Sequence, residues 1–272
     1  DPTTTFHDRP TQRIGDLTVE YRAMKGETDD DCTLWIPEHR MLFVGDKATW
    51  KVPNSGNPLK VQRYPVEWVT GLEEMAGYGA EWLCPGHDLV LRGADLVRTF
   101  LLDQARYLRS IIDQVLARMN AGQAYDEILR AVAPDPELAG LPHIRTAYNH
   151  PKFIVRDLLR YWGGWWDGEG STLLPAPRSD QAAEIIRLAG GPEPVLTRTR
   201  ELAEAGNLAL ACHLVDWATK ADPQYLPAQE LKRHVYRERA DREEHGMAAG
   251  FFLSEAADAD REIECLTRQS DE

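Results

Sequence analysis

Up to about residue 90, hydrophobic and polar positions follow the period of β-strands. Between residues 17 and 23 apolar side chains alternate with polar ones, which predicts a strand with one buried face. Two short apolar runs separated by a Pro-containing turn predict a hairpin, and a Pro-started helix and one more strand complete this region. These elements are expected at 33–36 and 41–44 (the hairpin), 65–75 (the helix) and 82–84 (the last strand).

From about residue 93 the apolar period becomes helical. One long amphipathic helix is predicted to begin near Gly93 and to end near Asn120. Further helices are expected at 124–133, 151–162, 180–189, 192–205, 207–220, 227–244 and 247–267. The pattern therefore predicts an α+β chain, in which a strand-containing domain at 1–92 precedes an all-α domain at 93–272.

Composition and charge exclude several classes of protein. The net charge of −13 is spread along the chain, which argues against a surface for nucleic acid or for anionic lipid. No apolar run reaches 18 residues, so we expect no membrane span. The four cysteines form no C-x-x-C pair, and we expect buried free thiols. A start at Asp1 suggests a processed product, and the compartment stays open, with the cytoplasm slightly favoured.

Three polar side chains stand just after predicted strands, where loops on a rigid sheet place functional groups. Glu27 follows the first strand in an acidic turn, Asp46 follows the hairpin, and His87 follows Pro85-Gly86. Each has a plain structural explanation when taken alone. An acidic turn is commonly solvated, an Asp can cap a helix, and a single His is more often structural than a ligand.

Together, the order and spacing of these residues resemble the second half of a metallo-β-lactamase αββα sandwich. The family commonly has His at the first position, and Glu27 in Gly-Glu-Thr resembles its alkylsulfatase branch. The resemblance implies that Glu27 binds one divalent ion, that His87 binds another, and that Asp46 bridges the two. Such ligands suit zinc (Zn). Asp46 is then also the catalytic residue that orients the attacking water.

The resemblance extends into the helical half of the chain. The helix that reaches Tyr161 and the stretch Gly164-Trp165-Trp166-Asp167-Gly168 are similar to the dimerisation region of alkylsulfatases. This resemblance implies a helical dimerisation domain at 93–272 and a homo-oligomer. We expect Trp162, Trp165 and Trp166 to serve packing rather than an alkyl-binding pocket.

The main metal-binding signature of the family, His-x-His-x-Asp-His, is missing. Eight His are present, and no two are spaced as His-x-His. The strand region is also too short to close a four-layer sandwich, so its sheet would expose an apolar face. We therefore expect a second polypeptide that carries the amino-terminal half of the domain. The alternative is a degenerate remnant that binds no metal.

For the substrate, the resemblance implies hydrolysis of a sulfate ester. Candidate sulfate-binding residues lie in the irregular loop after Asp46 and are Asn54, Asn57, Arg63 and Tyr64, each of which ordinary turn or surface chemistry could also explain. The Asn-rich segment of the family is not clearly reproduced at 47–50. Two alternatives stay open: another hydrolase on this scaffold, acting on lactones or phosphoesters, and a non-catalytic helical scaffold subunit.

Overall fold

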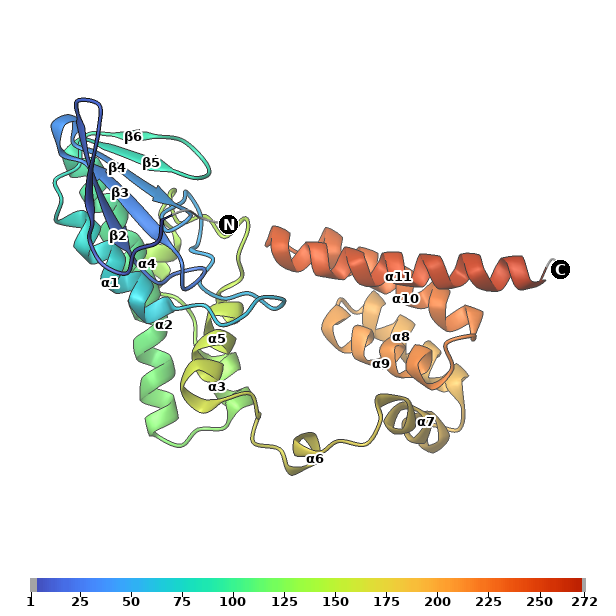
Figure 1. Ribbon diagram of the computed structural model, residues 1–272. Helices are drawn as coiled ribbons and strands as arrows, with labels where there is room; N and C mark the ends of the chain where they lie inside the picture. Colours follow the sequence, from blue (N-terminus) through green and yellow to red (C-terminus); the bar gives the residue numbers. More distant parts are fainter. Residues whose placement is uncertain (1–3, 271–272) are drawn as a thin grey trace. The chain divides into compact units, whose positions relative to one another are not determined.

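A computed structural model describes residues 4–270 of the chain. It divides into two compact units, Asp1–Gly168 and Glu169–Glu272 (Figure 1). The first contains the sheet and the helices next to it, and the second is entirely helical.

The first unit is built on a single six-stranded sheet. Its strands lie in sequence order, each beside the next. They are β1 (Thr11–Ile14), β2 (Leu17–Ala23), β3 (Cys32–Ile36), β4 (Met41–Gly45), β5 (Trp82–Pro85) and β6 (Leu91–Arg92). All neighbours are antiparallel except β4 and β5, which are parallel and joined by the helix α1 (Pro65–Ala76).

The directions of these strands decide where the loops meet. Because β3 is antiparallel to both β2 and β4, the strands β2 and β4 run the same way, and β5 runs parallel to β4. The carboxyl ends of β2, β4 and β5 therefore lie at one edge of the sheet. The three loops that leave this edge are the ones that carry Glu27, Asp46 and His87.

One face of the sheet is buried under α1 and α2 (Ala94–Asn120). Leu42, Val44 and Leu83 point to this side and are no more than 1% exposed. The helices α3 (Tyr125–Ala131), α4 (Pro136–Ala139) and α5 (Pro151–Gly163) pack around α2 and enlarge the same core. A short 3-10 helix, η1 (Pro37–His39), forms the turn between β3 and β4.

The opposite face of the sheet is apolar and only partly covered. Side chains alternate between the two faces of a strand, so the neighbours of the buried residues point outward. Phe43 is 36% exposed, and four other residues of this face are half-buried: Leu34, Met41, Trp82 and Cys84. Burying such a face is a strong driving force for association.

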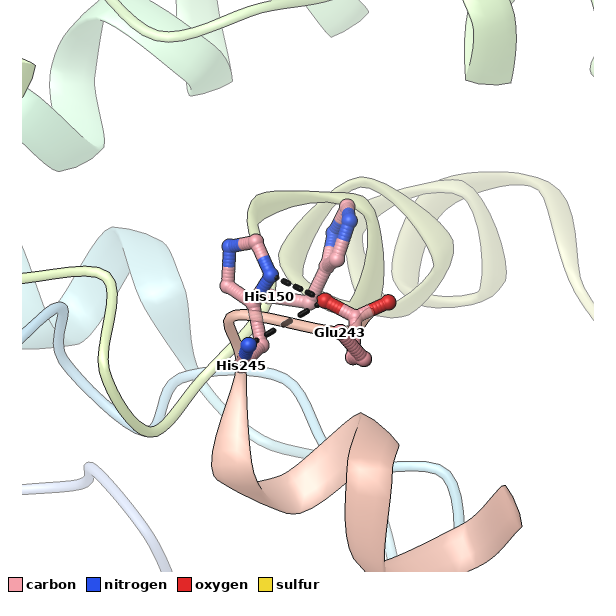
Figure 2. A group of neighbouring side chains, drawn as sticks. All are labelled: His150, Glu243 and His245. Atoms are coloured by element: carbon pink, nitrogen blue, oxygen red, sulfur yellow. Dashed lines mark hydrogen bonds and ion pairs between the residues drawn. The ribbon is translucent and has the colours of Figure 1, made fainter. Parts of the chain in front are cut away.

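The second unit consists of helices around a separate apolar core. They are α6 (Gly170–Leu173), α7 (Arg178–Leu188), α8 (Pro192–Glu204), α9 (Leu208–Ala221), α10 (Leu226–Asp241) and α11 (Gly246–Ser270). Both α7 and α8 pack against α9, α9 packs against α10, and α10 lies along α11. In the turn between these two, Nδ1 of His245 lies 2.6 Å from Oε1 of Glu243 (Figure 2).

The pattern-based predictions agree closely with these elements. The strand at 17–23, the hairpin, the strand at 82–84 and the helices from 65 onward are all present, with ends shifted by at most a few residues. The four cysteines are free thiols, but the expected burial holds for Cys212 alone, since Cys32 and Cys265 are exposed. The strands β1 and β6 were not predicted, because both are short and lie at the sheet's edges. No described helix is long and apolar enough to cross a membrane.

The compact units do not divide at the predicted domain boundary, residues 92 and 93. The long helix α2 packs against α1 and buries its apolar stripe in the core of the first unit. The division instead falls after Gly168. Helical periodicity begins at residue 93, but periodicity does not reveal which core a helix joins.

The fully buried stripe of α2 predicts a large effect of truncation there. Leu101 is 0% exposed, so Leu101→Ala should lower the free energy of unfolding by about 3 kcal/mol. Leu96→Ala, on the same helix but 51% exposed, should cost less than about 0.5 kcal/mol. Urea unfolding measures both. Equal losses would contradict this placement of α2.

Candidate metal and anion site

Glu27, Asp46 and His87 line one pocket at the carboxyl edge of the sheet. Its volume is about 330 Å³, which is within the range of small-molecule sites. Asn54, Asn57 and Arg63 line it as well. The fold therefore brings together six of the seven side chains predicted for the site.

Asp46 and His87 are in direct contact. Nδ1 of His87 lies 2.5 Å from Oδ1 of Asp46, and this carboxylate raises the pKa of the imidazole by hydrogen bonding. The amide of Gly86 donates to the carbonyl of Gly45 at 2.7 Å, which joins the two strand ends. A Cβ on Gly86 would lie 2.8 Å from Oδ1 of Asp46, so glycine is needed for this approach.

Glu27 is held from two sides. Nη1 of Arg63 donates to Oε2 of Glu27 at 2.7 Å and to its backbone carbonyl at 2.5 Å. Nδ2 of Asn54 donates to the other carboxylate oxygen, Oε1, at 2.7 Å. The Arg63 side chain is only 4% exposed, and this ion pair is consequently shielded from water. These bonds fix the direction of the carboxylate.

The loop that carries Asn54 and Arg63 is anchored on residues much later in the chain. Nδ2 of the buried Asn149 donates to the carbonyl of Pro53 at 2.9 Å. The amide of Val52 donates to the carbonyl of Arg145 at 3.0 Å. An irregular loop without regular backbone pairing depends on such bonds for its shape.

Asp157 of α5 anchors the far end of this loop. Its Oδ2 accepts from the backbone amide of Arg63 at 3.3 Å, and Oδ1 accepts from Arg160 at 2.8 Å. Asp157 is 4% exposed, and burial raises the pKa of its carboxyl to about 6, against the opposing effect of Arg160.

Tyr64 is the predicted site residue that the pocket lining does not include. Its ring instead lies 4.8 Å from Nζ of Lys25 and packs on Tyr161. The pocket has further lining residues that the sequence analysis did not assign: Thr49, Lys51, Val52, Lys60 and Tyr148. Four of these lie in the same irregular loop, which is the signal that could have found them. Nothing local indicates Tyr148.

The donor types present suit divalent metal ions. Two carboxylates and one imidazole are ligands that zinc and similar ions accept. The ligand atoms of Glu27, Asp46 and His87 do not all lie within 4.8 Å of one another, so the three do not surround a single ion. Oδ1 of Asn54 is buried without a hydrogen-bond partner among residues 4–270, so the pocket retains an unused acceptor. The set is incomplete for two ions, since no His-x-His-x-Asp-His stretch occurs in the chain.

Comparison with protein families identifies the chain. Residues 124–262 match the family described as alkyl sulfatase dimerisation. This match covers half of the chain, and the chain belongs to that family. The predicted resemblance to alkylsulfatases is thereby confirmed.

Two curated relatives and one solved structure extend the match to nearly the whole chain. A linear primary-alkylsulfatase of Pseudomonas sp. is 28% identical over 87% of this chain and 45% of its own length. An (R)-specific secondary-alkylsulfatase of Pseudomonas sp. is 23% identical over 92% and 39%. The stereoselective inverting sec-alkylsulfatase Pisa1 from Pseudomonas sp. superposes with a TM-score of 0.88 at 22% identity, covering 94% of this chain and 41% of Pisa1.

These comparisons confirm the predicted α+β fold class, a half sandwich followed by a helical dimerisation domain. The chain spans less than half the length of the curated relatives it matches.

The buried Asp157 predicts a pH dependence of stability. An unfolded Asp has a pKa near 4, so the folded chain binds this proton more tightly. Stability from this group is present below pH about 4 and is lost as the pH rises through about 6, by at most about 1.4 kcal/mol per pH unit. Asp157→Asn should flatten the slope of the unfolding free energy between these values.

The matched control is Asp113→Asn, an exposed carboxylate on α2. It should leave the slope as in the unmodified chain. Denaturant unfolding from pH 4 to pH 8 measures all three proteins. An unchanged slope in Asp157→Asn would show that another group titrates.

Proposed function

We propose that this chain contributes half of the active site of a two-metal hydrolase that cleaves sulfate esters. The observation that carries this proposal is the meeting of Glu27, Asp46 and His87 in one pocket, although they are far apart in the sequence. Three side chains of ligand type are not expected by chance to follow three strands at the same edge of the sheet. The names of the curated relatives, which are alkylsulfatases, support sulfate esters as the substrate class.

The proposed ligands divide between two divalent ions, for which zinc is the best candidate. Glu27 would hold one ion and His87 the other, with Asp46 between them. Bound there, the ions would supply a water of lowered pKa and would offset negative charge on the substrate. Asp46 would hold and orient that water through its carboxylate.

Cations around the pocket suit an anionic substrate. Lys51 and Lys60 line it, and Lys60 is exposed, so its ammonium can approach a sulfate oxygen. Arg63 donates Nη1 to Glu27. This bond favours a role for Arg63 in holding the proposed metal ligand over direct contact with sulfate. Asn54 also donates to the Glu27 carboxylate, and we give it the same holding role.

The remaining ligands would come from a polypeptide segment with His-x-His-x-Asp-His. The outward face of the sheet offers the place for it, since Phe43 and its apolar neighbours are partly exposed there. A second sheet packed on that face would bury them. The segment can be a separate chain or part of a longer precursor.

We also propose that the helical region forms a homodimer. The match of 124–262 to a dimerisation family supports this assembly. Exposed apolar side chains of the segment after α5, Trp165 and Leu174 above all, are suitable for burial in such an interface.

Zinc binding to the purified chain tests the ligand assignment. We expect at least one zinc ion per molecule in isothermal titration calorimetry. Glu27→Gln should weaken binding at least tenfold, because it removes the charge but keeps the shape and the contact with Asn54. His87→Ala should weaken it similarly by removing an imidazole donor.

The matched control is His39→Ala, an exposed imidazole on η1 outside the pocket. It should leave the zinc affinity unchanged. Binding that is absent, or equally strong in all variants, would contradict the proposed metal site and favour a non-catalytic scaffold.

Activity distinguishes the reaction classes. Protein purified from its source under native conditions should release sulfate from dodecyl sulfate and lose this activity after chelation. A co-purifying or contiguous segment with His-x-His-x-Asp-His is expected, and peptide mass spectrometry detects it. Hydrolysis of a lactone or a phosphoester instead of dodecyl sulfate would favour the alternative hydrolases.

A further inference from the structure

Lys47 is the one lysine among residues 4–270 that is fully buried at the carboxyl edge of the sheet. It follows Asp46 directly, and its side chain is 1% exposed. A buried ammonium is costly unless its protons all find acceptors. Its contacts therefore indicate what it does.

The ammonium of Lys47 binds the turn that carries Glu27. Nζ donates to the carbonyls of Lys25 at 2.7 Å and of Met24 at 3.2 Å. It also lies 3.8 Å from Oδ2 of Asp31. That same oxygen accepts from the backbone amide of Glu27 at 2.7 Å. Lys47 and Asp31 thus connect the strand end at Asp46 with the backbone of Glu27.

The packing around Lys47 leaves little freedom. A Cβ on Gly26 would lie 2.3 Å from Oδ2 of Asp31 and 2.5 Å from Nζ of Lys47, so the turn closes tightly over both charges. The carbonyl of Lys47 accepts from Nε1 of Trp68 at 2.7 Å, which fixes its own backbone to α1. The turn is consequently tied to the sheet and to the core helix.

We propose that Lys47 is a positioning residue, which sets Glu27 relative to Asp46 so that both carboxylates can serve one metal centre. The proposal rests on the proposed function. Lys47 does not line the pocket. It acts through the backbone of residues 24–31, in the way that outer partners orient metal ligands.

Lys47→Met tests this role, since Met has similar length and no proton to donate. We expect zinc affinity to fall tenfold or more, as is typical for the loss of an outer partner. Amide hydrogen exchange in 24–31 should become at least tenfold faster, because Asp31 and its neighbours lose the cation that orders them.

Lys152→Met is the matched control. Nζ of Lys152 also donates to two backbone carbonyls, those of Arg130 and Val132 at 2.9 and 2.7 Å, but outside the pocket. This variant should keep the zinc affinity and the exchange rates of 24–31 at their original values. Equal weakening of zinc binding in both variants would reduce Lys47 to a general stabilising residue and overturn the proposal.

Asp31→Asn is a second variant that tests the same role if Lys47→Met does not fold. The amide keeps an acceptor for Glu27 but removes the charge that faces Lys47. It should also speed exchange in 24–31 and weaken zinc binding. Original zinc affinity together with original exchange rates would overturn the proposal.

The two proposals fail in different ways. If the unmodified chain binds no zinc, the proposed function fails, and the exchange rates still report on Lys47. If zinc binds with the same affinity to the unmodified chain and to Lys47→Met, the metal site stands and the positioning role is wrong.

Discussion

The parallel pairing of β4 with β5 is the constraint on which the candidate site depends. The helix α1 connects the two strands and covers the sheet, so both strands end at the same edge. The bond from the amide of Gly86 to the carbonyl of Gly45 then joins those ends and brings His87 onto Asp46. Since β2 runs in the same direction, Glu27 leaves the sheet at that edge too.

Buried cations make this gathering of carboxylates tolerable. Arg63 pairs with Glu27, and Lys47 faces Asp31 beneath the same turn. Burying a cation is energetically costly, and at Lys47 this burial lowers the pKa of the ammonium to about 8. A chain of net charge −13 could leave its acidic groups in solvent. Here two buried cations contact one turn, which is consistent with a functional requirement for the position of Glu27.

Hydrogen bonds within this chain therefore order the side chains that are proposed as metal ligands. Both oxygens of Glu27 have hydrogen-bond donors, and Asp157 and Asn149 hold the loop that provides them. Such preorganisation lowers the cost of assembling a complete centre. The apolar outward face of the sheet is the place where a segment with the remaining proposed ligands would pack.

Much of this could be predicted from sequence, because periodicity reports local burial. Period-two and helical patterns located β2 to β5 and most helices within a few residues, and the spacing of Glu27, Asp46 and His87 indicated a shared site. Other features depend on contacts between distant residues, which leave no local pattern. The packing of α2 with the sheet, the bond of Arg63 to Glu27, the lining by Tyr148 and the burial of Lys47 are of this kind. Only the tertiary structure decided them.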